Sequence, residues 1–247
     1  IQNKNFSWFS DFSLSHNREK IKELASGQLK DEANAWFVGE PFKVFYDYKK
    51  EGIWQLGEEA AAAANGQEPG DIKVQDVDGN GVITTDDRII YSQRPDVTFG
   101  FNNTFNYKGF DLSVFLYARL GQWIAYDYNT TYRINALENG GNVDYWTPEN
   151  PTNAFPRPNK SKSYTQVTYY STLKYEDGSF FKIRDITLGY TFKPELLKHL
   201  NLSRLRVYAT AKNFFTFSKI DNYDPEQGGS ISFPMTKQLV FGLNVEF

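Results

Sequence analysis

The segment from Asp76 to Asp87 carries the residue types of a calcium-binding loop. It reads Asp-Val-Asp-Gly-Asn-Gly-Val-Ile-Thr-Thr-Asp-Asp, with a glycine at the sixth position and a carboxylate at the twelfth. Oxygen ligands at this spacing suit Ca²⁺, because it prefers carboxylate, amide and backbone carbonyl oxygens. The expected ligands of one structural Ca²⁺ are Asp76, Asp78, Asn80, Val82 through its backbone carbonyl, Thr84 and Asp87.

Two features favour the alternative interpretation that this segment is a metal-free turn. The twelfth position is Asp87 rather than the usual Glu, so its carboxylate reaches less far. The segment is preceded by Pro69-Gly70-Asp71-Ile72-Lys73-Val74, which does not predict a helix leading into the loop. Asp, Asn and Gly are also the ordinary residues of tight turns between strands.

A second stretch, residues 121–177, combines aromatic side chains with Asn, Asp and Gln. Aromatic rings stack on the C–H face of a sugar while amides and carboxylates bind its hydroxyls. Tyr145 and Trp146 are the expected exposed contacts with a substrate. The alternative is that most of these aromatic residues pack the loop on itself or on a partner protein.

No catalytic residue is predicted. The two histidines, His16 and His199, lie outside any HExxH motif, and neither a GxSxG motif nor a phosphate-binding glycine-rich loop is present. The absence of cysteine excludes a thiol nucleophile, a disulfide framework and a Cys-ligated zinc site. Carboxylates are abundant, but their abundance alone does not indicate glycosidase chemistry.

Composition excludes a transmembrane helix and is compatible with a transmembrane β-barrel. The chain has 247 residues, of which 17% are aromatic and 40% are hydrophobic, and no run of eighteen apolar residues predicts a transmembrane helix. A transmembrane barrel tolerates a polar average because its inward-facing residues alternate with lipid-facing ones. The net charge of −3, without a basic run, argues against nucleic acid as a partner.

The elements that would carry these loops are strands with a period of two. The clearest is 237–247, where Leu239, Phe241, Leu243, Val245 and Phe247 alternate with mostly polar residues. About ten residues with one apolar face suit a tilted crossing of a bilayer. The other alternating segments are 6–14, 42–48, 97–107, 110–120, 186–192 and 205–211, which makes about seven strands.

Loop lengths predict how these strands cross the membrane. Barrels of the outer membrane have short periplasmic turns and long extracellular loops. The turn at 107–110 and the connection 193–203 are short, whereas 49–96, 121–177 and 218–234 are long. If 42–48 runs outward, 6–14 runs inward and 17–40 is periplasmic. Charged residues that alternate with apolar ones should face the lumen, namely Arg119, Arg206, Lys212 and Glu246.

Several motifs follow one another over nearly the whole chain. They are Val38-Gly-Glu-Pro-Phe-Lys-Val-Phe-Tyr-Asp-Tyr48, Glu51-Gly-Ile-Trp-Gln55, Gly70-Asp-Ile-Lys73, the Asp76–Arg88 loop, Pro95-Asp-Val-Thr-Phe-Gly100, Phe181-Lys-Ile-Arg-Asp-Ile-Thr-Leu-Gly-Tyr-Thr191, Ala211-Lys-Asn-Phe-Phe-Thr216 and Asp224-Pro-Glu226. In this order they resemble the C-terminal part of SusC-like (SusC/RagA family) TonB-dependent transporters.

This resemblance implies an all-β fold in the outer membrane of Bacteroidetes-type bacteria. The chain 1–247 would be the C-terminal portion of a 22-stranded barrel with long extracellular loops. The plug domain and the segment that contacts TonB would lie upstream in the same polypeptide, since the chain opens within a strand pattern. The family imports oligosaccharides or peptides with a SusD-like surface lipoprotein as a lid, commonly as a dimer of such pairs.

Two other interpretations remain open from the residues. A secreted, calcium-stabilised β-sandwich that binds carbohydrate would use the same alternating strands and the same acidic loop. A surface adhesin would share the loops but would need no lid protein.

Overall fold

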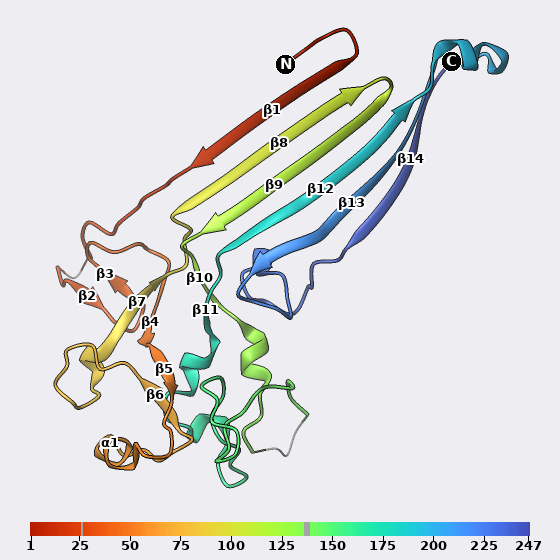
Figure 1. Cartoon of the computed structure of the whole chain (residues 1–247). Coiled ribbons are helices and arrows are strands. Elements are labelled where there is room, and N and C mark those ends of the chain that lie inside the picture. The colour runs from red at the N-terminus through yellow and green to blue at the C-terminus, as the bar shows by residue number, and fades with distance from the viewer. Residues whose placement is uncertain (26, 136–138) are drawn as a thin grey trace.

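Six strands form one antiparallel sheet, which we call the wall. The computed structural model describes residues 1–25, 27–135 and 139–247. Across the wall lie, in spatial order, β1 (Phe6–Ser15), β8 (Val97–Tyr107), β9 (Phe110–Leu120), β12 (Phe180–Thr191), β13 (Arg204–Ser218) and β14 (Gln238–Glu246) (Figure 1). The sheet is curved but open, so the described strands do not close into a barrel.

The register of the wall separates apolar from polar side chains. Residues directly opposite one another on neighbouring strands share a face. Val207 of β13 pairs with Tyr190 and Leu243, whereas its neighbour Arg206 pairs with Thr191 and Asn244. One face is therefore mainly aliphatic and aromatic and the other is polar. The residues expected to face a lumen, Arg119, Arg206, Lys212 and Glu246, all lie on the polar face.

The apolar face is exposed in this chain. Phe241 is 77% exposed and Leu243 is 68% exposed, and large apolar residues of β1, β9 and β12 are exposed as well. A β-sandwich would cover such a face with a second sheet. Apart from the wall, the sheets in the described part of the chain have two strands each. The described residues therefore do not form the β-sandwich of the alternative interpretation.

Strands β12 and β13 are longer than the predicted segments 186–192 and 205–211. The pairing shifts between Ile183 and Asp185. Arg184 is an additional residue of β12 relative to β9, and β13 has one additional residue relative to β12. A bulge of this kind reverses the phase of the apolar alternation. The pattern that begins at Ile186 therefore does not extend back through Phe181, although the strand continues.

The prediction that 42–48 is a strand of the barrel is wrong. Strand β4 (Val44–Tyr48) pairs with β7 (Arg88–Ser92) in a separate two-stranded sheet. Strand β1 pairs directly with β8, so 16–96 is one long excursion from a single end of the wall. The segments 17–40 and 49–96 therefore lie at the same end of the wall. The prediction that they lie on opposite sides of the membrane is wrong, because it depended on counting 42–48 as a crossing strand.

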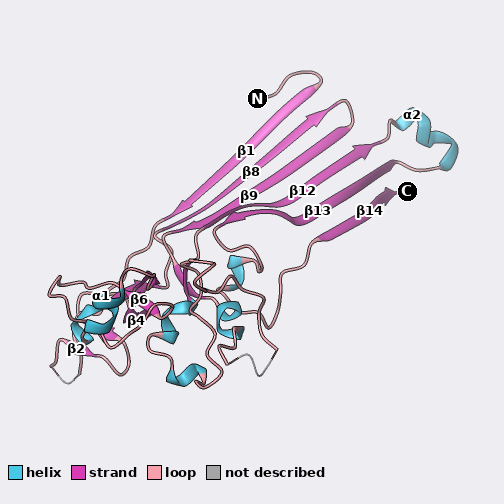
Figure 2. Ribbon diagram, turned by 60° about the horizontal axis from the view of Figure 1, so that its bottom comes forward, coloured by secondary structure: helices cyan, strands magenta, loops and turns pink. Residues whose placement is uncertain are grey.

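The two ends of the wall differ in the size of their connections. At one end lie the tight turn between β8 and β9 and a short connection with α2 (Pro194–Leu197). The expected turn at 107–110 and the expected short connection 193–203 are thus both present. The other end carries the segments 16–96, 121–179 and 219–237, whose described residues we call the cap (Figure 2).

The cap is built from short elements. Besides β4 and β7 it contains β2 (Lys30–Asp31), β3 (Trp36–Phe37), β5 (Lys50–Ile53), α1 (Glu59–Ala64), β6 (Ile72–Val74), β10 (Trp123–Ala125) and β11 (Tyr175–Asp177), with several short 3-10 helices. Strand β5 pairs with β6, and β10 pairs with β11. Among the described residues, none of the helices has the length and apolar character needed to cross a membrane.

Candidate functional site in the cap and on the polar face

An ion pair crosses the polar face of the wall from β9 to β13. The Arg206 guanidinium donates to both carboxylate oxygens of Asp111, over 2.9 Å from Nε and 2.5 Å from Nη2. Gly189 of the intervening strand lies beneath this pair, and a Cβ at Gly189 would approach both partners to about 2.5 Å. Gly189 is therefore needed so that the two charged groups can meet across β12.

A buried lysine ties the loop after β13 to the polar face. The Nζ of Lys182 is fully buried and lies 2.6 Å from Asp224 and 2.8 Å from Glu226, which also pairs with Arg184. Asp224 caps the following 3-10 helix by accepting a hydrogen bond from the backbone N–H of Glu226. A buried charge is tolerated only when it is paired in this way. Loop 219–237 is therefore held against the polar face.

The sequence did not indicate this ion-pair cluster as a functional element. Asp224-Pro225-Glu226 was recognised only as a motif of the resemblance, and Lys182 lies before the bulge that disturbs the strand pattern. An acidic pair in one loop and a lysine more than forty residues earlier give no local signal that they meet.

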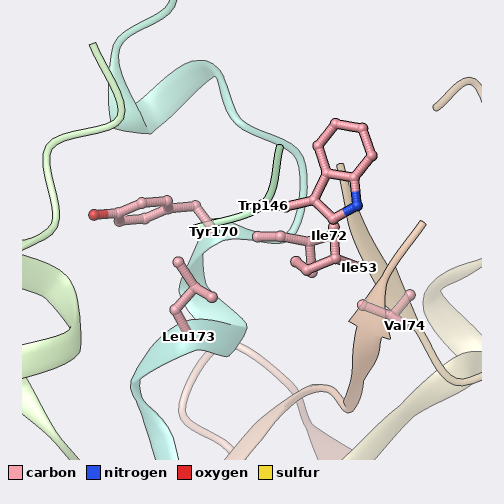
Figure 3. Packing of buried hydrophobic residues seen from close by; sticks show 6 residues of the cluster. All are labelled: Ile53, Ile72, Val74, Trp146, Tyr170 and Leu173. Atoms are coloured by element: carbon pink, nitrogen blue, oxygen red, sulfur yellow. The ribbon is translucent and has the colours of Figure 1, made fainter. Parts of the chain in front are cut away.

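The cap has its own small hydrophobic core. Its buried residues are contributed by the two long excursions 16–96 and 121–179, and they are Ile53, Ile72, Val74, Trp146, Tyr170 and Leu173 (Figure 3). The hydroxyl of Tyr170 donates to the backbone carbonyl of Tyr132 over 2.6 Å. This hydrogen bond lies within the second excursion, whereas the shared core joins the two excursions into one folded unit.

The expectation that Trp146 is an exposed substrate contact is wrong. Trp146 is only 4% exposed, and its indole N–H donates to the side-chain oxygen of Gln55 over 2.9 Å. It also contacts Gly70, where a Cβ would lie 2.6 Å from the indole and where φ is +90°. Trp146 is thus a core residue of the cap. Tyr145 is 43% exposed, and its role as a substrate contact stays a prediction.

A polar cleft of roughly 240 Å³ lies in the cap beside β10 and β11. Its walls include Trp123, Tyr175, Lys50, Glu176 and Asp177. Burial raises the pKa of the Glu176 carboxyl and lowers the pKa of the Lys50 ammonium. Rings beside partly buried charged groups could stack on a ligand and bind its polar groups. No sequence pattern indicates this cleft, because its walls come from six separate segments of the chain.

The predicted calcium ligands are gathered in one loop of the cap. Carboxylate oxygens of Asp76, Asp78 and Asp87 lie within 4.8 Å of one another. Asp76 accepts hydrogen bonds from the backbone N–H groups of Gly79 and Gly81. Asn80 accepts one from Val82. These oxygen donors suit a hard cation such as Ca²⁺.

Asp87 also stabilises the loop through the protein itself. It is fully buried, and its two carboxylate oxygens accept hydrogen bonds from the backbone N–H groups of Thr84 and Val77, each over 2.7 Å. The hydrogen bond from Thr84, with others from the backbone, lowers the pKa of the Asp87 carboxyl. Thr84 in turn caps the 3-10 helix that follows. The same geometry therefore serves a metal-free turn, and calcium binding stays a prediction.

Comparison with known proteins gives relatives over the whole chain. No family model matches. The chain is 30% identical over 284 residues to TonB-dependent receptor P3 of Formosa agariphila and 28% identical over 271 residues to TonB-dependent receptor SusC of Bacteroides thetaiotaomicron. Each alignment includes all of this chain but only 27% and 25%, respectively, of the relative.

Solved structures show the same arrangement of strands. A structure described as the RagAB peptide transporter matches all of this chain and 28% of its own, with a TM-score of 0.72 and 23% identity. The RagAB peptide importer in its open-open state matches with the same TM-score and 25% identity. The wall thus corresponds to part of a barrel. The chain belongs to the SusC-like family of TonB-dependent receptors, which are outer-membrane proteins of Bacteroidetes-type bacteria.

Proposed function

We propose that this chain is part of a transporter that imports oligosaccharides or peptides across the outer membrane. The observation that carries the proposal is the two-faced wall, with apolar residues exposed on one side and ion pairs on the other. In a transmembrane barrel the apolar face meets lipid and the polar face lines the interior. Receptors named as TonB-dependent among the relatives support uptake driven through TonB.

In this proposal the cap lies outside the cell and the short turns lie in the periplasm. Long loops at one end and tight turns at the other are typical of outer-membrane barrels. The cap then faces both the arriving substrate and a SusD-like surface lipoprotein that acts as a lid. Tyr145 and the cleft beside Trp123 are the proposed contacts of the cap with substrate. The complete barrel would have 22 strands, and two transporter–lipoprotein pairs would form a dimer.

The two candidate substrate classes, oligosaccharides and peptides, are both polar chains. Similarity to SusC and to a RagAB peptide importer supports uptake of nutrients without choosing between sugar and peptide. The cleft combines aromatic rings with both signs of charge, so it is compatible with either. Direct identification of the bound cargo is therefore required.

The test is purification of the protein from native outer membrane in mild detergent, followed by mass spectrometry of the intact complex. We expect a longer polypeptide that includes this chain, a co-purifying surface lipoprotein, and a bound oligosaccharide or peptide whose mass identifies its class. Recovery of a free, soluble protein of this chain's mass would overturn the proposal. Recovery of the longer polypeptide in the membrane without a lipoprotein would contradict only the proposed lid protein.

We also propose that the loop 76–87 binds a structural Ca²⁺. Its support is the donor set of Asp76, Asp78, Asn80, Val82, Thr84 and Asp87, which consists of oxygen atoms only. The ion would hold the loop beside the cap core and would take no part in chemistry.

A further inference from the structure

The apolar face of the wall contains a furrow over β13. The furrow has a volume of roughly 580 Å³. The small side chains of Val207 and Ala209 lie between larger ones of the two neighbouring strands. Those larger residues are Leu188 and Tyr190 of β12, and Phe241 and Leu243 of β14, with Phe110 of β9 beside Tyr190.

All of the side chains that form this furrow belong to strands that are paired in the described wall. Its depth follows from the sequence of β13, because small residues alternate there with polar ones while both neighbours present large apolar groups. Leu188 is 52% exposed, which leaves the furrow open to whatever surrounds the wall. An apolar hollow on a lipid-facing surface can hold one acyl chain against the protein, so that this chain packs on side chains instead of on the mobile lipids of the bilayer.

The end of the furrow lies near cationic side chains of the short-turn end. Lys108 is two residues before Phe110, and Lys193 is three residues after Tyr190. At about 3.3 Å per residue, both backbones lie within about 10 Å of the furrow along their strands. The turns also meet, because the N–H of Thr191 donates to the carbonyl of Gly109 over 2.8 Å.

These cations are not neutralised by acidic neighbours. Lys193 and Lys198 have no ion-pair partner among the described residues. Arg204 pairs with Glu246, and Glu195 is a further carboxylate nearby in sequence. Lys108, Lys193 and Lys198 therefore leave the short-turn end positively charged. Basic groups at a membrane surface attract anionic head groups.

The connection that carries two of these lysines is itself amphipathic. Leu197 is buried against the protein, whereas Leu196 and Leu200 are 61% and 62% exposed. Exposed leucines beside lysines are the pattern of a segment that lies in the interface of a membrane. The ring of Tyr190 contacts those of Phe110 and Phe192, and these aromatic residues lie at the same end of the wall, as is typical of a membrane interface.

We propose that this furrow and the adjoining lysines form a binding site for one glycerophospholipid of the periplasmic leaflet. An acyl chain lies over Val207 and Ala209, and the phosphate lies against Lys193 and Lys108. The lipid comes from the periplasmic leaflet, because the furrow opens at the short-turn end of the wall. Lipopolysaccharide would instead approach the cap end of the wall.

The test is lipid analysis of the complete transporter, purified from outer membrane and exchanged extensively into mild detergent. We expect about one retained glycerophospholipid per copy, seen by intact-complex mass spectrometry and confirmed by extraction. The variant Ala209→Phe fills the furrow and should lower retention roughly tenfold. The matched control Val114→Phe enlarges a residue of the same apolar face outside the furrow and should leave retention unchanged.

A second variant tests the head-group contact without altering the wall. Lys108→Gln together with Lys193→Gln should weaken retention roughly fivefold per lysine in contact, and more for anionic than for zwitterionic lipids. Equal retention by the wild type and by correctly folded Ala209→Phe would overturn the proposal. So would retention of lipopolysaccharide alone, or seating of another protein or a second copy on this face. If Ala209→Phe fails to fold, unchanged retention by the lysine variant overturns the proposed head-group contact.

Discussion

The wall and the cap place their apolar residues in opposite directions. In the wall, large side chains such as Phe241 point away from the protein and are largely exposed, while Arg206 and Asp111 pair on the other face. In the cap, Trp146 and Ile72 are buried in a central cluster. Apolar side chains thus lie on the outer surface of the wall but in the interior of the cap, because the two regions differ in the solvent that surrounds them.

Burial of apolar side chains is achieved differently in the two regions. Apolar side chains leave water by packing on one another in the cap and by contact with lipid in the wall. Exposure of Phe241 would be unfavourable for a cap residue but is expected for a wall residue. The position of a side chain relative to the membrane, rather than its exposure in the isolated chain, therefore decides whether it stabilises the protein.

The largest expected effect is in the cap. Trp146→Ala should destabilise the cap by about 3–5 kcal/mol, because it leaves a cavity in a small core and removes the hydrogen bond to Gln55. Limited proteolysis and thermal unfolding of the full protein would measure the loss. Tyr145→Ala, at the exposed neighbour, should stay within about 0.5 kcal/mol of the wild type. Equal effects of the two variants would contradict the core assignment.

A comparable effect is expected where the cap loop meets the wall. Lys182→Met leaves Asp224 and Glu226 nearly buried without their main partner, which typically costs about 3–5 kcal/mol. Loop 219–237 should detach and become sensitive to protease, whereas the rest of the wall should remain intact. Lys219→Met removes an exposed lysine from the same loop and serves as the control. Unchanged protection of the loop in Lys182→Met would show that the ion pairs do not hold it.

The next prediction tests which face of the wall meets lipid. Val114→Arg puts a charge on the apolar face near the middle of β9 and should cost about 2–4 kcal/mol in the membrane. The measurement is the yield of folded protein in isolated outer membrane. The neighbouring variant Ser113→Arg points to the polar face and should assemble much better. Normal assembly of Val114→Arg would mean that this face does not meet lipid.

A smaller effect is expected from calcium in the cap. At a concentration one hundred times its dissociation constant, bound Ca²⁺ should stabilise the cap by about 2.7 kcal/mol. Calorimetric titration with Ca²⁺, compared with chelator-treated protein, measures this directly. Asp78→Ala should abolish binding, whereas Asp86→Ala, an adjacent exposed carboxylate outside the cluster, should not. Absence of any heat of binding in the wild type would favour the metal-free turn.

The smallest effect concerns an exposed ion pair of the wall. Arg204 and Glu246 lie 3.2 Å apart but are both more than half exposed, so Arg204→Ala should change stability by about 0–1 kcal/mol. Arg206→Ala should cost more, because Asp111 is largely enclosed and loses a two-point contact. Thermal unfolding in the same detergent would compare the two. A larger loss for Arg204→Ala would contradict this ranking.

The sequence by itself determined the faces of most strands. Strands β8, β9 and β14 agree with the segments 97–107, 110–120 and 237–247 because a period of two directly reports which side chains share a face. The tight turn at Lys108-Gly109 and the long loops were likewise local properties of the chain. The motifs in family order identified the receptor family, which the relatives then confirmed.

Tertiary structure decided which elements meet. A period of two does not name a partner, so 42–48 was assigned to the barrel although it pairs with β7 in the cap. The bulge at Arg184 shifted the phase of β12 and concealed its first half. The burial of Trp146 and the pairing of Lys182 with Asp224 depend on segments that are far apart in the chain. Such contacts arise only when the loops fold together, because no short-range pattern encodes the distance between them.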